Sequence, residues 1–565
     1  MRGKRVMLHS TYRQNETRTS VLAGSNRDFF RKSSPLFQFE TSPYNQARMK
    51  HRLIPLVLLI CGCTLGKKEE DGVFRYHLAN EPQSLDPARL TSTDASYFFN
   101  NIMRGLYSYS NERGLEAEGA ESCHFVTPLR LECKLAQTFW SDGSEVVADD
   151  YVRAFRRLLS AGGKNPSVEL LKNLKNALQV HQGKLPPAEL GMQAVGKDRL
   201  IFEFEKPDPD FLYKLTTSVL VPTKIDSYPE RGKVEGLYFN GPYRVVQWTL
   251  GSRLHLEPNP YYKRGNPERP RVEILVNLDD EQTALNLYEQ KTLTFLRRLP
   301  TTYIPKYKGR SDFHQIPLAR FDYIGFGAEL KDHPKLRSAL AHGADYRELQ
   351  IIYDALGIPG CPSLPEELAE EMPCVRFDLE RAKRDLAEVP AEVRKKRFKL
   401  YFSKSGGDDI KKGMEWFQEQ WKKNLGIQVD LHQTEQGVYL ALLREKPPAI
   451  FRKGVGLERP TCLAALETFA VDGAENFLRL NDPKYERLIE SLALISRPDT
   501  FGRTTKPPTP KMKKLCTEAL RHLLDQNVLI PLGRIHFTIL ADTRFKGWSL
   551  NEMNQLDLAH LRYQP

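Results

Sequence analysis

The segment from Phe139 to Leu159, FWSDGSEVVADDYVRAFRRLL, constrains the fold more than any other part of the chain. Phe139 and Trp140 are typical of the end of a strand, and the Ser-Asp-Gly that follows them favours a turn. The sequence ADD at residues 148–150 predicts a helix start, because acidic side chains stabilise the positive end of a helix. Apolar residues then recur on one helical face. The segment therefore predicts a strand, a turn and an amphipathic helix.

Other segments have equally clear patterns of secondary structure. Residues 397–402 and 427–431 are predicted strands that flank a predicted helix over residues 408–425. Parallel strands joined by a packed helix imply a right-handed crossover in an α/β lobe. A hairpin is predicted at residues 122–135, and a helix is predicted around residues 166–180. The chain is therefore expected to be of the mixed α/β class.

The net charge of the chain is concentrated at its beginning. Of the total of +12, residues 1–48 carry +6 and residues 49–63 carry +2, which leaves +4 for the remaining 502 residues. A nucleic-acid-binding surface needs a much stronger concentration of basic residues, so no nucleic-acid partner is expected. A composition of 40% apolar and 27% charged residues is that of an ordinary soluble globular protein.

Residues 49–63 have the parts of a bacterial lipoprotein signal. A short basic start, MKHR, precedes the apolar run LIPLVLLI, which is too short to span a bilayer as a helix. The run ends in ICGC, which resembles the lipoprotein cleavage box and makes Cys63 the lipidated first residue of the mature protein. The protein is therefore expected in the periplasm or cell envelope, with a lipid anchor in the membrane.

Residues 1–48 have no apolar periodicity and little hydrophobic content. They are expected to be disordered or never translated, with Met49 as the true start of the protein.

Short motifs follow one another from residue 81 to residue 548 in an order that a known family shares. They are EPQSLDP at 81–87 with GL at 105–106, WSDG at 140–143, GPY at 241–243 with NPYY at 259–262, LRSALAHGAD at 336–345, IPL at 530–532 and KGW at 546–548. This series resembles the extracellular solute-binding proteins that serve bacterial oligopeptide and dipeptide importers. The resemblance covers Phe74 to Trp548.

The resemblance implies a two-lobed periplasmic-binding-protein fold, with an extra subdomain in lobe 1 and a cleft that closes by hinge motion. It implies a monomer without cofactor that captures oligopeptides and delivers them to the permease subunits of an ABC importer. The expected divisions are an extension (1–48), signal peptide (49–62), tether (63–72), lobe 1 (73–114), extra subdomain (115–195), lobe 1 (196–320), lobe 2 (321–530) and a return to lobe 1 (531–565).

The expected ligand site follows from the same resemblance. Peptide-binding relatives carry a run like R-x-G-W-x-x-D-Y-x-x-P, whose aspartate accepts the α-ammonium of the peptide. In the run RKGVGLERP, Arg452 and Gly454 match in place, and Glu458 falls where the aspartate would be. Val455 replaces the tryptophan and the step to the proline is two residues shorter, so the alternative is that Glu458 is a solvated loop residue. The loop Thr91-Ser92-Thr93 falls where relatives offer backbone to the first residues of the peptide.

Cysteine spacing adds two structural predictions. In an exported protein, cysteines that are close in sequence are expected to form disulfides, here Cys123–Cys133 and Cys361–Cys374. Cys462 and Cys516 are either buried thiols or a third, long-range pair.

The sequence contains no recognisable catalytic or metal-binding constellation. HExxH, GxSxG and CxxC are absent, and the histidines do not form tight pairs. Residues 191–197 approach a phosphate-binding loop, but Asp198 stands where a serine or threonine is required, so a turn before a strand at 200–205 is predicted instead. We therefore expect a binding protein and no enzyme. The alternatives are a binder of a non-peptide solute, such as a nickel chelate or haem, and an exported hydrolase on the same lobes.

Overall fold

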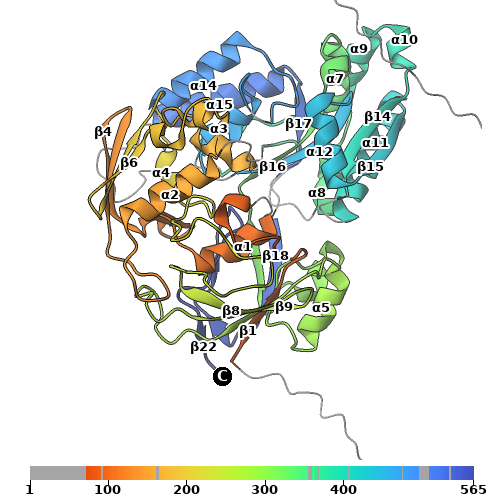
Figure 1. Cartoon of the computed structure of the whole chain (residues 1–565). Coiled ribbons are helices and arrows are strands. Elements are labelled where there is room, and N and C mark those ends of the chain that lie inside the picture. Colours follow the sequence, from red (N-terminus) through yellow and green to blue (C-terminus); the bar gives the residue numbers. More distant parts are fainter. Residues whose placement is uncertain are drawn as a thin grey trace, which may run out of the picture. The chain divides into compact units, whose positions relative to one another are not determined.

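The computed structural model describes residues 72–565, except 91–92, 161–164, 354–358, 363, 366–367, 405–407, 458, 474, 496–507 and 534–535. The predicted extension, the signal peptide, Cys63 and most of the tether lie outside the described residues. The compact unit Glu69–Pro565 contains seven sheets within its described part (Figure 1). Two large hydrophobic cores organise it. We call lobe 1 the residues around the core that runs from Phe74 to Val276 and resumes at Ile539–Leu561, and lobe 2 those around the core between Ala319 and Leu532.

Lobe 1 begins with a four-stranded sheet in the order β1-β10-β9-β8. β1 runs parallel to β10, whereas β8 and β9 form an antiparallel hairpin. The strands are β1 (Phe74–His77), β10 (Val272–Leu275), β9 (Arg253–Pro258) and β8 (Tyr243–Thr249). The nearby helix α1 (Thr93–Ile102) contacts β8 and buries Phe98, Phe99 and Ile102.

A second, antiparallel sheet in lobe 1 has the order β4-β5-β7-β6. Its strands are β4 (Ala120–Thr127), β5 (Arg130–Leu135), β7 (Arg199–Glu203) and β6 (Met192–Val195). Residues 192–195 are the strand β6 itself, and the turn after them leads into β7 and not into a helix, so residues 191–197 do not form a phosphate-binding loop. The boundary predicted between residues 195 and 196 falls inside this sheet, because β7 pairs with both β5 and β6.

Helix α2 (Ala148–Leu158) is the helix predicted from the first motif. The Asp150 side chain accepts hydrogen bonds from the Val147 backbone N–H (3.1 Å) and from Trp140 Nε1 (3.1 Å), so it caps the helix and satisfies a buried indole. The prediction that Phe139 and Trp140 end a strand is wrong. Phe139 makes an isolated bridge with Glu145, because residues 138–146 fold back on themselves around the turn.

The helix predicted around residues 166–180 is also wrong as a single helix. A 3₁₀ helix at Pro166–Leu171 is followed by a separate short helix, α3 (Ala177–His181). The break falls at Asn176, which adopts a left-handed backbone with φ of 63°. Its N–H donates to Glu205 Oε1 (2.8 Å) and its side chain donates to the Glu189 carbonyl (2.7 Å). Asparagine tolerates this conformation because its short polar side chain bonds locally.

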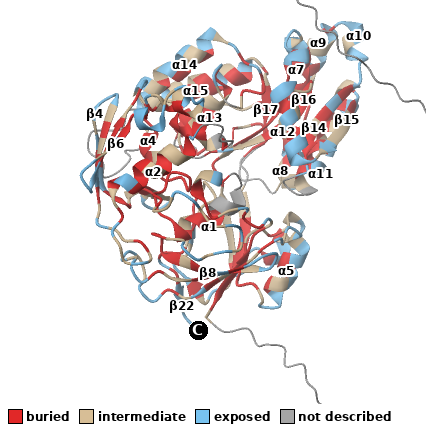
Figure 2. Ribbon diagram, viewed as in Figure 1, coloured by how far each residue is buried: buried red, intermediate tan, exposed pale blue. Residues whose placement is uncertain are grey.

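Lobe 2 is built on a five-stranded sheet in the order β15-β14-β16-β13-β17. Its strands are β15 (Val429–Thr434), β14 (Phe398–Ser403), β16 (Ile450–Gly456), β13 (Arg320–Phe326) and β17 (Leu529–Pro531). The parallel pairing of β14 with β15 across helix α11 (Asp408–Leu425) confirms the predicted strand–helix–strand unit. Met414, Phe417 and Trp421 of α11 are fully buried. Figure 2 shows the strands β14, β16 and β17 mostly as buried.

The chain crosses between the cores of the two lobes through two adjacent segments. The three-stranded sheet β11-β18-β12 contains β11 (Phe295–Leu296), β18 (His536–Ala541) and β12 (Phe313–Pro317). The chain passes from β12 directly into β13 and returns from β17 into β18, and Pro317 pairs with His536 beside both crossings. Two neighbouring crossings are the arrangement that permits hinge motion between lobes.

The remaining elements cover these sheets. They are α4 (Phe211–Lys214), α5 (Glu281–Glu289), α6 (Ile304–Tyr307), α7 (Pro334–His342), α8 (Tyr346–Tyr353), α9 (Leu379–Ala387), α10 (Ala391–Arg394), α12 (Gln436–Glu445), α13 (Cys462–Leu466), α14 (Pro483–Ile495), α15 (Pro510–Asp525), β2 (Tyr107–Ser110), β3 (Gly114–Ala117), β19 (Phe545–Lys546), β20 (Ser549–Leu550), β21 (Leu556–Asp557) and β22 (Arg562–Tyr563). Within the described residues, no helix combines the length and hydrophobicity needed to cross a bilayer.

The opening motif EPQSLDP is hydrogen-bonded to two distant segments of lobe 1. The buried Glu81 carboxylate accepts hydrogen bonds from Trp248 Nε1 (2.8 Å) and from the Gly251 N–H (3.1 Å). Asp86 binds both ends of the Arg157 guanidinium, at 3.0 and 2.8 Å. Bidentate pairs of this kind combine strength with fixed geometry. These motif residues therefore hold the scaffold of lobe 1.

Asp150→Ala is expected to destabilise lobe 1 by about 2–4 kcal/mol, because it removes the helix cap and leaves the Trp140 N–H buried without a partner. Urea unfolding measures the loss. The matched control is Asp149→Ala, one residue earlier on the exposed side of the same turn. Equal stability of the two variants would contradict this role.

The structure pairs the six described cysteines as Cys123–Cys133, Cys361–Cys374 and Cys462–Cys516. We expect exported, non-reduced protein to show no free thiol among these six after denaturation and alkylation. Replacing both cysteines of the third pair by alanine should destabilise most, by about 4 kcal/mol against about 3 for either local pair, since its sequence separation is 54 against 10 and 13. Mass spectrometry of alkylated protein measures the pairing. Alkylation of any of the six before reduction would contradict that pair.

Candidate ligand site on the central strands of lobe 2

The candidate site lies where β13 and β16 pair in antiparallel fashion. The register places Asp322 opposite Gly454 and Ile324 opposite Arg452. Side chains two residues apart on a strand share a face, so Arg320, Asp322 and Arg452 meet on one side of the sheet. Arg320 donates to Asp322 from Nε (2.6 Å) and from Nη2 (3.1 Å), and Arg452 Nη2 donates to Asp322 Oδ1. Two guanidinium groups thus share one carboxylate.

The electrostatics of this cluster favour an anion. The Asp322 side chain is 0% exposed. Burial alone would raise its pKa, but the charges of Arg320 and Arg452 outweigh burial and hold the pKa below the ordinary value. One positive charge therefore remains unbalanced among the three groups. Arg452 Nε is buried and has no hydrogen-bond partner among the described residues. A carboxylate from a ligand would supply the missing charge and acceptor.

Gly454 is required for this arrangement. A Cβ at this position would lie 2.2 Å from both Arg320 Nη2 and Asp322 Oδ1. The absence of a side chain at Gly454 leaves the space beside β13 in which the Arg320 guanidinium meets the aspartate. This gives a structural reason for the glycine in the R-x-G motif.

Lys453 lies on the opposite face of the sheet. Its Nζ donates to Glu475 Oε1 (3.1 Å) and lies 5.7 Å from the centre of the Phe477 ring. Burial lowers the pKa of Lys453, and the neighbouring Glu475 opposes that effect only in part. Lys453 therefore belongs to the packing of lobe 2 and does not face the cluster around Asp322.

Only part of the predicted site can be located. Arg452 and Gly454 both lie in strand β16, opposite Ile324 and Asp322 of β13. Glu458, Thr91 and Ser92 lie outside the described residues, and Thr93 begins helix α1 with its side chain outside the description. Sequence reasoning missed two members of the site, Arg320 and Asp322. The available signal was their spacing, because in RFDYIGF the two charged residues, Arg320 and Asp322, are two positions apart and so share one face of an otherwise apolar strand.

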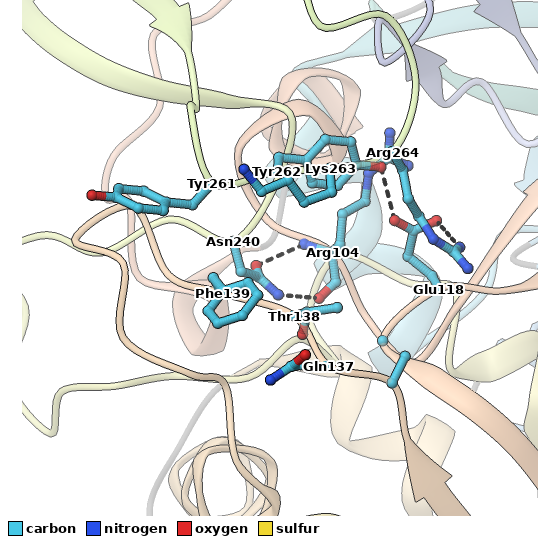
Figure 3. A pocket seen from close by; sticks show the side chains of 12 residues that line it. Arg104, Glu118, Gln137, Thr138, Phe139, Asn240, Tyr261, Tyr262, Lys263 and Arg264 are labelled. Carbon is cyan, nitrogen blue, oxygen red and sulfur yellow. Dashed lines mark hydrogen bonds and ion pairs between the residues drawn. The ribbon is translucent and has the colours of Figure 1, made fainter.

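A different hollow lies in lobe 1 and is shown in Figure 3. Its volume is about 80 Å³, well below the several hundred Å³ of an ordinary small-molecule site. Its polar groups are already engaged with one another. Glu118 accepts from Tyr262 Oη (2.8 Å) and from Arg264 Nη1 (3.2 Å), and Asn240 bonds the backbone of Arg104 in both directions. This hollow is too small for an oligopeptide. Among the described residues, no cluster of histidine, cysteine or acidic side chains could hold a metal ion.

Two sheets with separate cores, joined by adjacent crossings, define a two-lobed periplasmic-binding-protein fold, as predicted. The chain belongs to the bacterial extracellular solute-binding proteins, family 5, whose model of the middle region matches residues 127–476.

Individual relatives cover most of the chain at low identity. The oligopeptide-binding protein OppA of Bacillus subtilis (strain 168) is 23% identical over 535 residues, which are 88% of this chain and 95% of that protein. The probable deoxycholate-binding periplasmic protein YgiS of Escherichia coli (strain K12) is 24% identical over 453 residues, 75% of this chain and 83% of that one. The solved structure of the Escherichia coli murein tripeptide binding protein MppA aligns with a TM-score of 0.71 at 20% identity, covering 87% of this chain and 98% of that one. This structural likeness confirms the fold.

Asp322→Asn is expected to lower the free energy of unfolding of lobe 2 by about 3–5 kcal/mol at pH 7, because it leaves two arginines without their counter-charge. The native pKa of Asp322 is depressed, so its contribution is complete above the ordinary value of 3.8 and is lost as the pH falls through the native pKa. The difference between wild type and variant should therefore shrink below about pH 4.

Denaturant unfolding at pH 7 and pH 3 measures both effects. The control is Asp430→Asn, a partly exposed carboxylate in strand β15 of the same sheet. A difference at pH 7 no larger than that of the control would contradict the buried role of Asp322.

Proposed function

We propose that the protein is the substrate-binding lipoprotein of an ABC importer, which captures oligopeptides in a closing cleft between its lobes and delivers them to a membrane permease. The family supports binding of an extracellular solute, and the names of OppA and MppA support a peptide as that solute. The observation that carries the proposal is the cluster of Arg320 and Asp322 on β13 with Arg452 on β16, the paired strand that holds the R-x-G motif.

The peptide is held as an added strand in this proposal. Backbone pairing supplies affinity that does not depend on side chains, and water-filled pockets tolerate variety among them. Glu458 accepts the α-ammonium of the peptide in the role of the relatives' aspartate, while the Thr91–Thr93 loop offers backbone groups. Arg452 contributes a guanidinium nitrogen that is free to meet a carboxylate of the ligand.

Binding without catalysis is part of the same proposal. The sequence contains no HExxH or GxSxG constellation, and the family is one of solute-binding proteins. The protein acts as a monomer without cofactor. It is exported and anchored through lipid on Cys63, with residues 63–72 as the tether that keeps it near its permease.

Glu458→Gln is expected to weaken the binding of free-amine peptides at least ten-fold and to leave N-acetylated peptides nearly unaffected, because it removes the charge that pairs with the ammonium. Calorimetry with peptides selected from a mixed pool by mass spectrometry measures this. The matched control is Glu445→Gln, an exposed carboxylate at the end of helix α12.

Equal affinity of the wild type for free and acetylated peptides would remove Glu458 from the site. Binding of deoxycholate or another non-peptide solute, with no peptide retained from the pool, would overturn the peptide proposal. Peptide fragments in place of intact peptides would indicate the hydrolase alternative.

Cys63→Ala, expressed from Met49, is expected to abolish labelling with radioactive palmitate and to leave a larger, unprocessed precursor, because the lipidated residue and its cleavage site are lost. Gel electrophoresis of labelled cells measures both. The control is Cys61→Ala within the same motif, which should still be processed. Normal processing of Cys63→Ala would contradict lipid anchoring at this position.

A further inference from the structure

Asp210 makes a contact between the two lobes that the proposed function does not use. It immediately precedes helix α4 of lobe 1. Its carboxylate accepts hydrogen bonds from Arg459 Nε (2.8 Å) and from Thr461 Oγ1 (2.6 Å), both in lobe 2. The Arg459 and Asp210 side chains are only 4% and 5% exposed, although 249 residues separate them. A fully desolvated ion pair therefore lies between the lobes.

The lobe 2 side of this contact is firmly held. Thr461 caps helix α13 by accepting from the Ala464 N–H (3.1 Å), and the disulfide Cys462–Cys516 fastens that helix to α15. The Arg459 guanidinium also pairs with Glu467. Burial would raise the pKa of Glu467, but Arg459 and then Lys214 outweigh it, so the net pKa is lowered. Arg459 and Thr461 are thus presented to Asp210 from a rigid base.

The lobe 1 side leaves Asp210 available for this partner. The neighbouring Asp208 is already neutralised by Lys214, whose Nζ lies 2.6 Å from Asp208 Oδ2 in a buried pair. A second contact, from Thr301 Oγ1 to Asp409 Oδ1 (2.6 Å), joins the small core around residues 284–307 to helix α11 of lobe 2. That contact involves one uncharged group, so the Asp210–Arg459 pair is the stronger of the two.

We infer that Asp210, Arg459 and Thr461 form a cross-lobe clasp that holds the protein closed before any ligand is bound. Without Arg459, closing would bury the Asp210 carboxylate with no cation beside it, because Lys214 is engaged with Asp208. Opening returns Asp210 to water, so the clasp decides which state is populated. Arg459 directly follows Glu458. If the proposed function holds, the clasp therefore also positions the loop that meets the ammonium of the peptide. Loss of the clasp then lowers the fraction of protein that is competent to bind, and the apparent affinity for peptide falls by the same factor.

Small-angle scattering of the ligand-free protein tests the clasp without any assumption about the ligand. We expect the wild type to scatter as the closed form, and Asp210→Asn to have a larger radius of gyration with a closed-to-open ratio at least ten-fold lower. The matched control is Asp557→Asn, which breaks a partly buried pair with Arg104 inside lobe 1 and should stay closed.

Thr461→Val, which removes the hydroxyl that donates to Asp210 and keeps the side-chain shape, is the second variant if Asp210→Asn does not fold, and it should also shift the population toward the open form. A wild type that is already open without ligand, or an Asp210→Asn variant as closed as the wild type, would overturn the clasp. So would a Thr461→Val variant as closed as the wild type.

Peptide affinity is a separate measurement. A ten-fold loss in Asp210→Asn supports the coupling of the clasp to the ligand loop. An open Asp210→Asn variant that binds peptide as tightly as the wild type would overturn the coupling and leave the clasp in place. If the wild type binds no peptide, the proposed function fails while the scattering result still decides the clasp.

Discussion

The carboxylate of Asp322, shared by two arginines on neighbouring strands, fixes the centre of lobe 2. Its burial requires both guanidinium groups, and their positions require the register that sets Asp322 opposite Gly454. Arg320 reaches the aspartate only because position 454 has no side chain. One interaction thus specifies the pairing of β13 with β16, the glycine in the motif and an unbalanced positive charge. These are the features from which a ligand site can be built.

Lobe 1 depends on a different set of buried carboxylates, and these explain why the sequence was sufficient to predict the fold. Glu81 joins the opening motif to Trp248 and Gly251, and Asp86 joins it to Arg157 in helix α2. The opening motif EPQSLDP was recognisable because it contains two residues, Glu81 and Asp86, that each need a particular distant partner. The periodicity of residues 397–431 was sufficient to predict the parallel strand–helix–strand unit of lobe 2. The reason is simpler there, because the helix packs directly against the two strands that it connects.

The wrong predictions and the missed site residues share a physical cause, because each depends on contacts between residues far apart in the sequence, which a local sequence pattern does not reveal. The helix predicted at residues 166–180 breaks where Asn176 hydrogen-bonds to Glu205 and to the Glu189 carbonyl. The boundary predicted near residue 195 falls between β6 and β7, which pair in one sheet. Asp322 and Arg452 are 130 residues apart, so their pairing follows from sheet register alone. Part of the predicted ligand site, Glu458 above all, remains a prediction from the resemblance.

Hydrogen exchange measured with and without a bound oligopeptide is the most direct test of the site. If the peptide is added as a strand beside the cluster of Arg320, Asp322 and Arg452, exchange should slow in residues 450–460 and remain unchanged in the hairpin β4–β5, which lies in lobe 1. Saturating peptide that leaves residues 450–460 unprotected, or that protects the hollow around Arg104 and Tyr262 instead, would contradict a ligand site on the central strands of lobe 2.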